Sequence, residues 1–256
     1  MLGYSRYYAE LDAETARLAD VVRTTDQALA VPTCPEWSLA DLAVHVGQGN
    51  RWAASMVERR VSRWLPRQET DDPEPPRGGD RLADWLLASA RRVGTAVREA
   101  GPDAAVWTWA EEQTAGFWLR RLTHEAVIHR LDADLAVGRP AALSAEVAAD
   151  GVSDLLACIA TLSSEDAADP VFAGLRGDGQ TLHFHATDDG LGSAGEWFVR
   201  RNPSGVRWEH GHRKGDVAVR GPALDLLLVL NRRATAGVSV LGDGQLFAHW
   251  LANSAW

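Results

Sequence analysis

Glu125 and His129 are two residues of metal-binding type that lie four positions apart in the sequence. In a helix, this spacing places both side chains on the same face. The neighbouring residues predict a helix that faces the core, where a carboxylate and an imidazole lose solvation that something must replace. A divalent metal ion can do so, and the pair therefore predicts part of a metal site. An exposed acid–imidazole pair is the alternative that the spacing alone leaves open.

His45 is the best candidate for a third ligand. Ser38 followed by Asp41 is a capping-box-like pattern, which predicts a helix that begins just after Ser38 and continues past His45. His45 falls on the apolar face of this helix, where an imidazole needs a partner. His45, Glu125 and His129 would hold a zinc-like ion from two helices and leave one position open for water, a thiol or a substrate.

The neighbours of this predicted site have other expected roles. His124 is rotated by about 100° from Glu125 around the helix, so we do not expect it to join the site. Asp132 lies one turn beyond His129 and could orient it, although we favour a position on the helix surface.

Two other pairs of histidines are rival metal sites. His183 and His185 alternate on a predicted strand and would share one face, as would His210 and His212. Neither pair has an acidic residue at a matching spacing. Solvent-facing strand positions also tolerate histidine without a function, and we favour that reading.

The elements that must position the first site form four amphipathic helices, followed by a different kind of domain. Helical periodicity predicts the helices over residues 11–29, 38–61, 80–99 and 114–137, with a Pro- and Gly-rich surface loop over 66–79. Together they predict a four-helix bundle spanning residues 1–142. Residues 143–256 predict a smaller α+β domain, with helices near 144–162, 223–232 and 246–253 and short strands near 181–187, 196–200, 206–210 and 217–219.

Composition narrows the class of protein. The chain has 256 residues, 46% of them hydrophobic, which is enough for a substantial core. Its net charge of −9 argues against nonspecific nucleic-acid binding. There is no signal-peptide pattern or membrane-spanning apolar run, so we expect a cytoplasmic protein that binds no membrane, and a monomer. Two distant cysteines predict reduced thiols, and no phosphate-binding glycine loop or nucleophile elbow is present.

Arg232 and Arg233 end an apolar helix in the second half of the chain. Cationic side chains at a helix C-terminus commonly compensate the helix dipole, and we expect this role for one of them. The other could bind a carboxylate with two hydrogen bonds.

Several stretches resemble the actinobacterial mycothiol-dependent maleylpyruvate isomerase family. They are residues 31–45, 124–133 and, more weakly, 225–233 with 238–242; Glu36 departs from a glycine common in the family. The resemblance implies a mainly α protein, with a DinB-like four-helix metal-binding bundle and a small C-terminal α+β domain. It also implies Zn²⁺ or another divalent metal at His45, Glu125 and His129, mycothiol as the thiol cofactor, and a functional arginine at Arg232 or the adjacent Arg233.

The resulting hypothesis is an enzyme that activates a low-molecular-weight thiol for attack on an electrophilic small molecule. The outcome would be cis–trans isomerisation of maleylpyruvate-like acids or transfer of the thiol, between which a metal site does not discriminate. One alternative is a non-catalytic, metal-stabilised protein that binds small molecules. A metal-assisted hydrolase is the reading we rank last, because it needs a general base near the ion.

Overall fold

The computed structural model describes residues 1–70, 74–166 and 170–254. The chain forms two compact units: one comprises Leu2–Ala142, and the other runs from Leu143 to the C-terminus and includes Met1. Among the described residues, no helix is long and apolar enough to cross a membrane. The loop predicted over 66–79 contains residues 71–73, which lie outside the described residues, and includes a short 3₁₀ helix, η1 (Arg67–Glu69).

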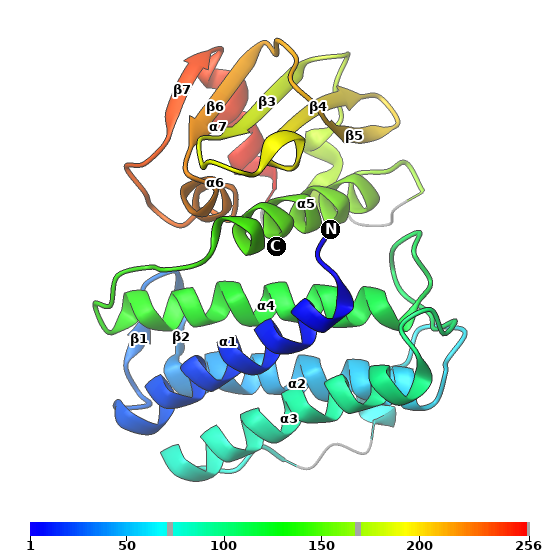
Figure 1. The fold of residues 1–256 in the computed structure, drawn as a ribbon, viewed down its shortest axis with the longest axis vertical. Helices are drawn as coiled ribbons and strands as arrows, with labels where there is room; N and C mark the ends of the chain where they lie inside the picture. The colour runs from blue at the N-terminus through cyan, green and yellow to red at the C-terminus, as the bar shows by residue number, and fades with distance from the viewer. Residues whose placement is uncertain (71–73, 167–169, 255–256) are drawn as a thin grey trace. The chain divides into compact units, whose positions relative to one another are not determined.

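The N-terminal unit is the predicted four-helix bundle (Figure 1). Its helices are α1 (Tyr4–Thr24), α2 (Leu39–Glu58), α3 (Gly79–Ala100) and α4 (Ala115–Ala136). A small antiparallel hairpin of β1 (Ala30–Val31) and β2 (Cys34–Ser38) connects α1 to α2. The predicted range of the first helix was wrong at both ends. Residues 4–10 are mostly polar, yet they are helical and contribute the fully buried Tyr7 to the core.

Side-chain caps fix where the two site-bearing helices begin. At α2 the Ser38 hydroxyl accepts a hydrogen bond from the Asp41 amide (3.2 Å), and the Asp41 carboxylate accepts one from the Ser38 amide (2.9 Å). This is the predicted capping box. At α4 the Thr114 hydroxyl accepts a hydrogen bond from the Phe117 amide. The caps set the helical register on which the candidate ligands lie.

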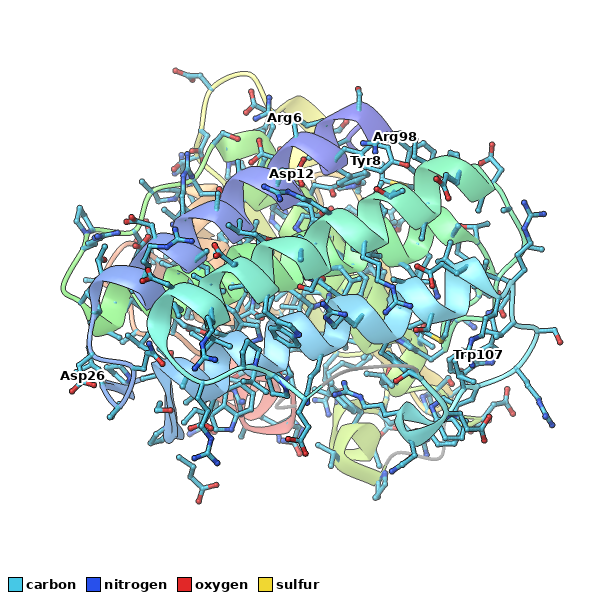
Figure 2. All side chains as sticks on the ribbon, turned by 90° about the horizontal axis from the view of Figure 1, so that it is seen from below. Arg6, Tyr8, Asp12, Asp26, Arg98 and Trp107 are labelled. Atoms are coloured by element: carbon cyan, nitrogen blue, oxygen red, sulfur yellow. The ribbon has the colours of Figure 1, made fainter. Side chains whose placement is uncertain are left out.

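Close packing between helices holds the bundle together. A Cβ atom on Gly47 of α2 would lie 2.0 Å from the Trp85 ring of α3, so this crossing requires glycine. At the surface between α1 and α3, the Arg98 guanidinium lies over the Tyr8 ring, 4.4 Å from its centroid (Figure 2). These contacts restrict how far the helices can slide.

A buried ionic network joins α1 to α4. Arg130 is 1% exposed and donates hydrogen bonds to Glu14, to Asp134 (2.9 Å) and to the Ala142 carbonyl (2.9 Å). Glu14 is fully buried, and burial raises its pKa, which the charge of Arg130 opposes. Such a network is costly to break because each unpaired charge would remain buried.

The C-terminal unit is the predicted smaller α+β domain. Its five-stranded sheet has the order β5-β4-β3-β6-β7, in which β3 and β6 are parallel and the other neighbours antiparallel. The strands are β3 (Thr181–Ala186), β4 (Glu196–Asn202), β5 (Gly205–His210), β6 (Val217–Gly221) and β7 (Ser239–Gly242). The helical elements are α5 (Ala145–Leu162), α6 (Ala223–Leu230), α7 (Gly244–Asn253) and the 3₁₀ turns η2 (Pro170–Leu175) and η3 (Gly192–Gly195). The sequence did not predict β7.

Candidate metal centre

The bundle brings His45 of α2 together with Glu125 and His129 of α4. The Glu125 Oε2 atom lies 3.7 Å from His45 Nε2 and 3.3 Å from His129 Nε2. One ligand atom from each residue lies within 4.8 Å of the others. Two imidazole nitrogens and one carboxylate oxygen form a donor set typical of catalytic zinc sites. The three side chains therefore fit a divalent metal ion.

The centre is more open than the sequence pattern indicated. The His45 side chain is 37% exposed and that of Glu125 is 30% exposed, whereas His129 is only 10% exposed. The expectation that His45 lies among core residues was wrong, because its position is at the edge of the apolar face of α2. The exposure on the His45 side gives small molecules access to the three ligand atoms.

Arg121 fixes the orientation of Glu125. Arg121 lies one turn before Glu125 on α4, and its guanidinium donates a hydrogen bond to Glu125 Oε1. The Oε2 atom of Glu125 is left facing the two histidines. Burial raises the pKa of Glu125, but the charge of Arg121 and the hydrogen bonds with His129 and His45 hold it well below its ordinary value. Glu125 is therefore anionic at neutral pH. The sequence analysis missed Arg121, although its four-residue spacing from Glu125 was a usable signal.

Asp132 orients His129 from the other side. Its Oδ2 atom lies 3.1 Å from His129 Nδ1, and its Oδ1 atom accepts a hydrogen bond from the Thr33 hydroxyl (2.7 Å). Asp132 is fully buried, so the surface position favoured from the sequence was wrong. Burial lowers the pKa of His129, but Asp132 and Glu125 together raise it to about 9. A proton kept on Nδ1 leaves Nε2 as the metal-binding atom.

Trp37 contributes an aromatic side to the centre. Its ring centroid lies 4.7 Å from that of His45 and 6.1 Å from that of His129. Its position in β2, just before the helix cap, places it there. His124, as expected, is absent from the cluster; it lies beside Tyr7, with ring centroids 6.2 Å apart.

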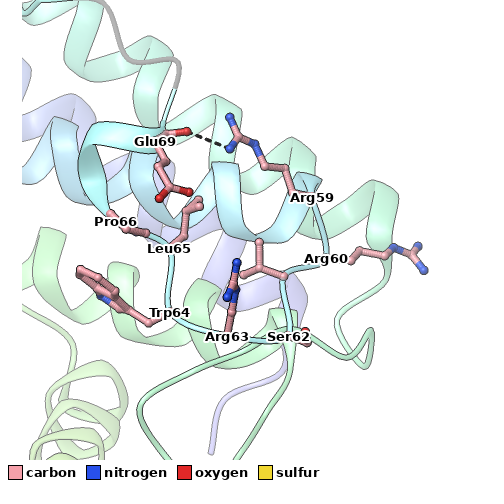
Figure 3. Close-up of a pocket in the computed structure, with 9 residues that line it drawn as sticks. Arg59, Arg60, Ser62, Arg63, Trp64, Leu65, Pro66 and Glu69 are labelled. Atoms are coloured by element: carbon pink, nitrogen blue, oxygen red, sulfur yellow. Dashed lines mark hydrogen bonds between the residues drawn. The ribbon is translucent and has the colours of Figure 1, made fainter.

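Two pockets lie elsewhere along the bundle. One, of about 700 Å³, is formed after the end of α2 by residues 59–66 and Glu69; there Arg59 donates a hydrogen bond to the Glu69 carbonyl (Figure 3). None of the three candidate ligands lines it. A second pocket, of about 360 Å³, is lined by Gln48 and Trp52 together with Arg67. Gln48 and Trp52 follow His45 by one and two helical turns, so this pocket begins on the same helix face.

The candidate arginine lies in the C-terminal unit, just after α6. Arg232 has a φ of 60°, and its amide donates a hydrogen bond to the Val229 carbonyl. Within the described residues its exposed guanidinium has no hydrogen-bond or ion-pair partner. The neighbouring Arg233 instead donates a side-chain hydrogen bond to the Asn231 carbonyl (2.7 Å). Of the two, Arg232 is the one with a guanidinium available to a ligand.

Comparisons with known proteins agree with this architecture. Residues 8–134 match the family model "Mycothiol maleylpyruvate isomerase N-terminal domain", and residues 146–249 match "MDMPI C-terminal domain". The crystal structure of the mycothiol-dependent maleylpyruvate isomerase is 17% identical with a TM-score of 0.56, and 93% of each chain is covered. A histidine-to-alanine mutant of that enzyme gives a TM-score of 0.55 at the same identity and coverage. At this identity the likeness shows the fold.

A search of curated protein sequences gives no match. The two family models nevertheless span most of the chain, one in each unit. The chain therefore belongs to the mycothiol-dependent maleylpyruvate isomerase family.

Proposed function

We propose that this protein is an enzyme that uses a divalent metal, Zn²⁺ by ligand preference, and mycothiol to act on an electrophilic small molecule. The observation that carries the proposal is the convergence of His45, Glu125 and His129 at an accessible point of the bundle. Family membership supports the choice of thiol. Three protein ligands leave a coordination position for an exogenous group, which a purely structural metal site does not require.

The residues of the chain have distinct tasks in this proposal. His45 and His129 present their Nε2 atoms and Glu125 presents one oxygen, while Arg121 holds Glu125 in place and Asp132 holds His129. A divalent metal bound there favours the thiolate form of a coordinating thiol at neutral pH. The thiol proton would pass to solvent, because Glu125 and Asp132 are already engaged by Arg121, Thr33 and His129.

The thiolate adds to an activated carbon–carbon double bond, forming a C–S bond while the π electrons move onto the adjacent carbonyl group as an enolate. Rotation about the new single bond and loss of the thiolate give isomerisation, whereas protonation of the enolate carbon by solvent gives the retained S-conjugate. We assign the polar portion of the thiol to the pocket that begins at Gln48 and Trp52, because that pocket continues the helix face of His45. We assign Arg232 to a carboxylate of the substrate, because its guanidinium has the required donors and no hydrogen-bond or ion-pair partner among the described residues.

The test combines metal analysis with turnover. Purified wild-type protein should convert a maleylpyruvate-like acid only when both a divalent metal and mycothiol are supplied. Chelation should abolish turnover, and restored Zn²⁺ should recover it. His45→Ala and His129→Ala should lose metal from this centre and activity together. Turnover that persists without thiol would refute the cofactor assignment, and folded protein without turnover on any electrophile would favour the non-catalytic alternative.

The two adjacent arginines provide a matched pair for the substrate site. Arg232→Ala should lower kcat/KM for a carboxylate substrate by about 10- to 100-fold. The reason is that a charge-assisted hydrogen bond contributes roughly 1.5–3 kcal/mol. Arg233→Ala removes the same charge one residue away and should leave kcat/KM near the wild-type value. Equal losses in both variants would contradict the assignment of Arg232.

A further inference from the structure

A second cluster of metal-binding side chains lies in the C-terminal unit, on the face of the sheet formed by β3 and β4. It consists of His183 and His185 of β3, Glu196 at the start of β4 and His212 just beyond β5, and we call it the sheet cluster. One ligand atom from each of the four lies within 4.8 Å of the other three. No part of the function proposed above uses these residues.

The strand geometry explains how the cluster forms. His183 and His185 are two positions apart on β3 and share a face, while Leu182 and Phe184 on the opposite face are fully buried. Glu196 is the direct cross-strand neighbour of His185 in the antiparallel β3–β4 pair. This is the acidic partner that the sequence alone did not reveal.

The chain after β5 brings in the fourth residue. The carbonyl of Glu196 accepts a hydrogen bond from the Gly211 amide (3.2 Å) and lies 3.0 Å from His210 Nδ1. These contacts fasten the segment after β5 to the start of β4 and place His212 over the cluster. His210 itself is not a member, and its ring lies beside Trp208. The predicted pairing of His210 with His212 was therefore wrong.

Two of the three distances from the carboxylate are close to those of a four-coordinate site, and the third is shorter. Glu196 Oε2 lies 3.1 Å from His183 Nε2, 3.4 Å from His185 Nδ1 and 2.6 Å from His212 Nδ1. Ligand bonds of about 2.0–2.1 Å in a tetrahedral zinc site separate ligand atoms by roughly 3.4 Å. The three imidazole planes are nearly perpendicular to one another, at 82–87°. Small side-chain adjustments would bring all four atoms around one cation.

Hydrogen bonding without a cation accounts less well for this arrangement. His183 and His212 lie at hydrogen-bond distance from Glu196 Oε2 and fill its two lone-pair sites, so the His185 ring nitrogen, 3.4 Å away, faces the same oxygen with no site left to accept a hydrogen bond from it. A central divalent ion would use one lone pair of each group and would offset the negative charge of Glu196. His183 is buried while the His212 side chain is 74% exposed, so an ion could enter from the solvent side.

We propose that His183, His185, Glu196 and His212 form a second Zn²⁺ site, in which four protein ligands occupy all positions. This site differs from the centre in the bundle, which has three protein ligands and an open position. A saturated site has a structural role: it cross-links β3, β4 and the segment after β5. Zinc bound there stabilises the C-terminal unit by mass action.

The test uses the full-length chain with the bundle centre removed by His45→Ala and His129→Ala. After dialysis against a weak chelator, this background should retain one equivalent of Zn²⁺ per chain, and the wild type two. Adding His212→Ala should weaken Zn²⁺ binding by more than about 100-fold, beyond the usual cost of losing only an outer-sphere contact. Because His212 is mostly exposed, this variant should remain folded, and circular dichroism checks that it does.

Two further variants make the outcome decisive. His249→Ala is the matched control, because it removes a histidine of the same unit that is not in the sheet cluster, and it should keep the zinc. His212→Cys restores a ligand and, with Co²⁺ in place of Zn²⁺, should add a thiolate-to-metal charge-transfer band. Folded background protein that binds no zinc would overturn the proposal, as would undiminished zinc binding by His212→Ala or an equal loss in His249→Ala.

Discussion

The contact between Asp132 and His129 gives a quantitative prediction about metal affinity. Asp132→Asn keeps the shape of the side chain and removes its charge. The carboxylate orients His129 and makes its Nε2 atom a stronger metal ligand. Losing such a group typically lowers metal affinity by about 10- to 100-fold, or about 1.4–2.7 kcal/mol. Together with Glu125, the same carboxylate also raises the pKa of His129 to about 9, so it strengthens binding of the competing proton.

These two effects oppose each other in a pH-dependent way. Below pH 9 the wild type must release the extra proton of His129 to bind metal, so its apparent affinity should rise about tenfold per pH unit. In Asp132→Asn the pKa of His129 falls toward its ordinary value, and this slope should flatten. The loss of affinity should thus be small near pH 7 and reach its full size near pH 9.

The assay is competition with a chromophoric chelator in zinc-buffered solution between pH 6.5 and pH 9, in a variant that lacks the sheet cluster histidine His212. Asp134→Asn is the matched control, since it removes another acidic group of α4 that pairs with Arg130 instead of His129. It should lose stability but keep both affinity and slope. A wild-type slope in Asp132→Asn, or the same affinity loss in the control, would refute the reasoning.

Three predictions concern the scaffold. Arg130→Met removes one of the two arginines that pair with the buried Glu14 and leaves Arg17 in place, so it should lower the free energy of unfolding by at most about 3–5 kcal/mol near pH 7.5. Because the pKa of Glu14 is already raised in the folded state, its contribution is lost as pH rises; urea titrations should show a smaller defect at pH 5 and rescue by Glu14→Gln. Gly47→Ala forces a methyl group against Trp85 and should cost about 1–3 kcal/mol by the same titration; a neutral result would mean that α2 and α3 separate easily. Ser38→Ala removes the cap of α2 and should lower stability by about 0.5–2 kcal/mol, whereas Ser38→Thr should retain most of it.

Local patterns were sufficient for most of the fold and for the core of the bundle centre. The Ser38 cap predicted the start of the helix that bears His45, and the i,i+4 spacing predicted that Glu125 and His129 share a face. These features depend only on residues within a turn or two of each other. The prediction that His45 meets the other two also relied on the bundle topology, since no local signal specifies which helix faces pack together.

The errors arose where side-chain roles depend on distant chain segments. Asp132 was assigned to the surface because its spacing fits either role, and only the packing of the β1–β2 hairpin, through Thr33, shows that it is buried. Glu196 was not connected with His185 because cross-strand register is not visible in a single sequence. Period-two alternation joined His210 to His212, but β5 ends at His210, and the chain turns at Gly211, which has a φ of 152°.

The ion pairs around Glu125 have a consequence for how the bundle centre is assembled. Arg121 and protonated His129 supply positive charge beside the carboxylates of Glu125 and Asp132, so these side chains balance one another electrostatically without an ion. The N-terminal unit can thus reach its final shape before any ion arrives. Metal binding would then replace the extra proton of His129 by a divalent cation without rearranging the helices.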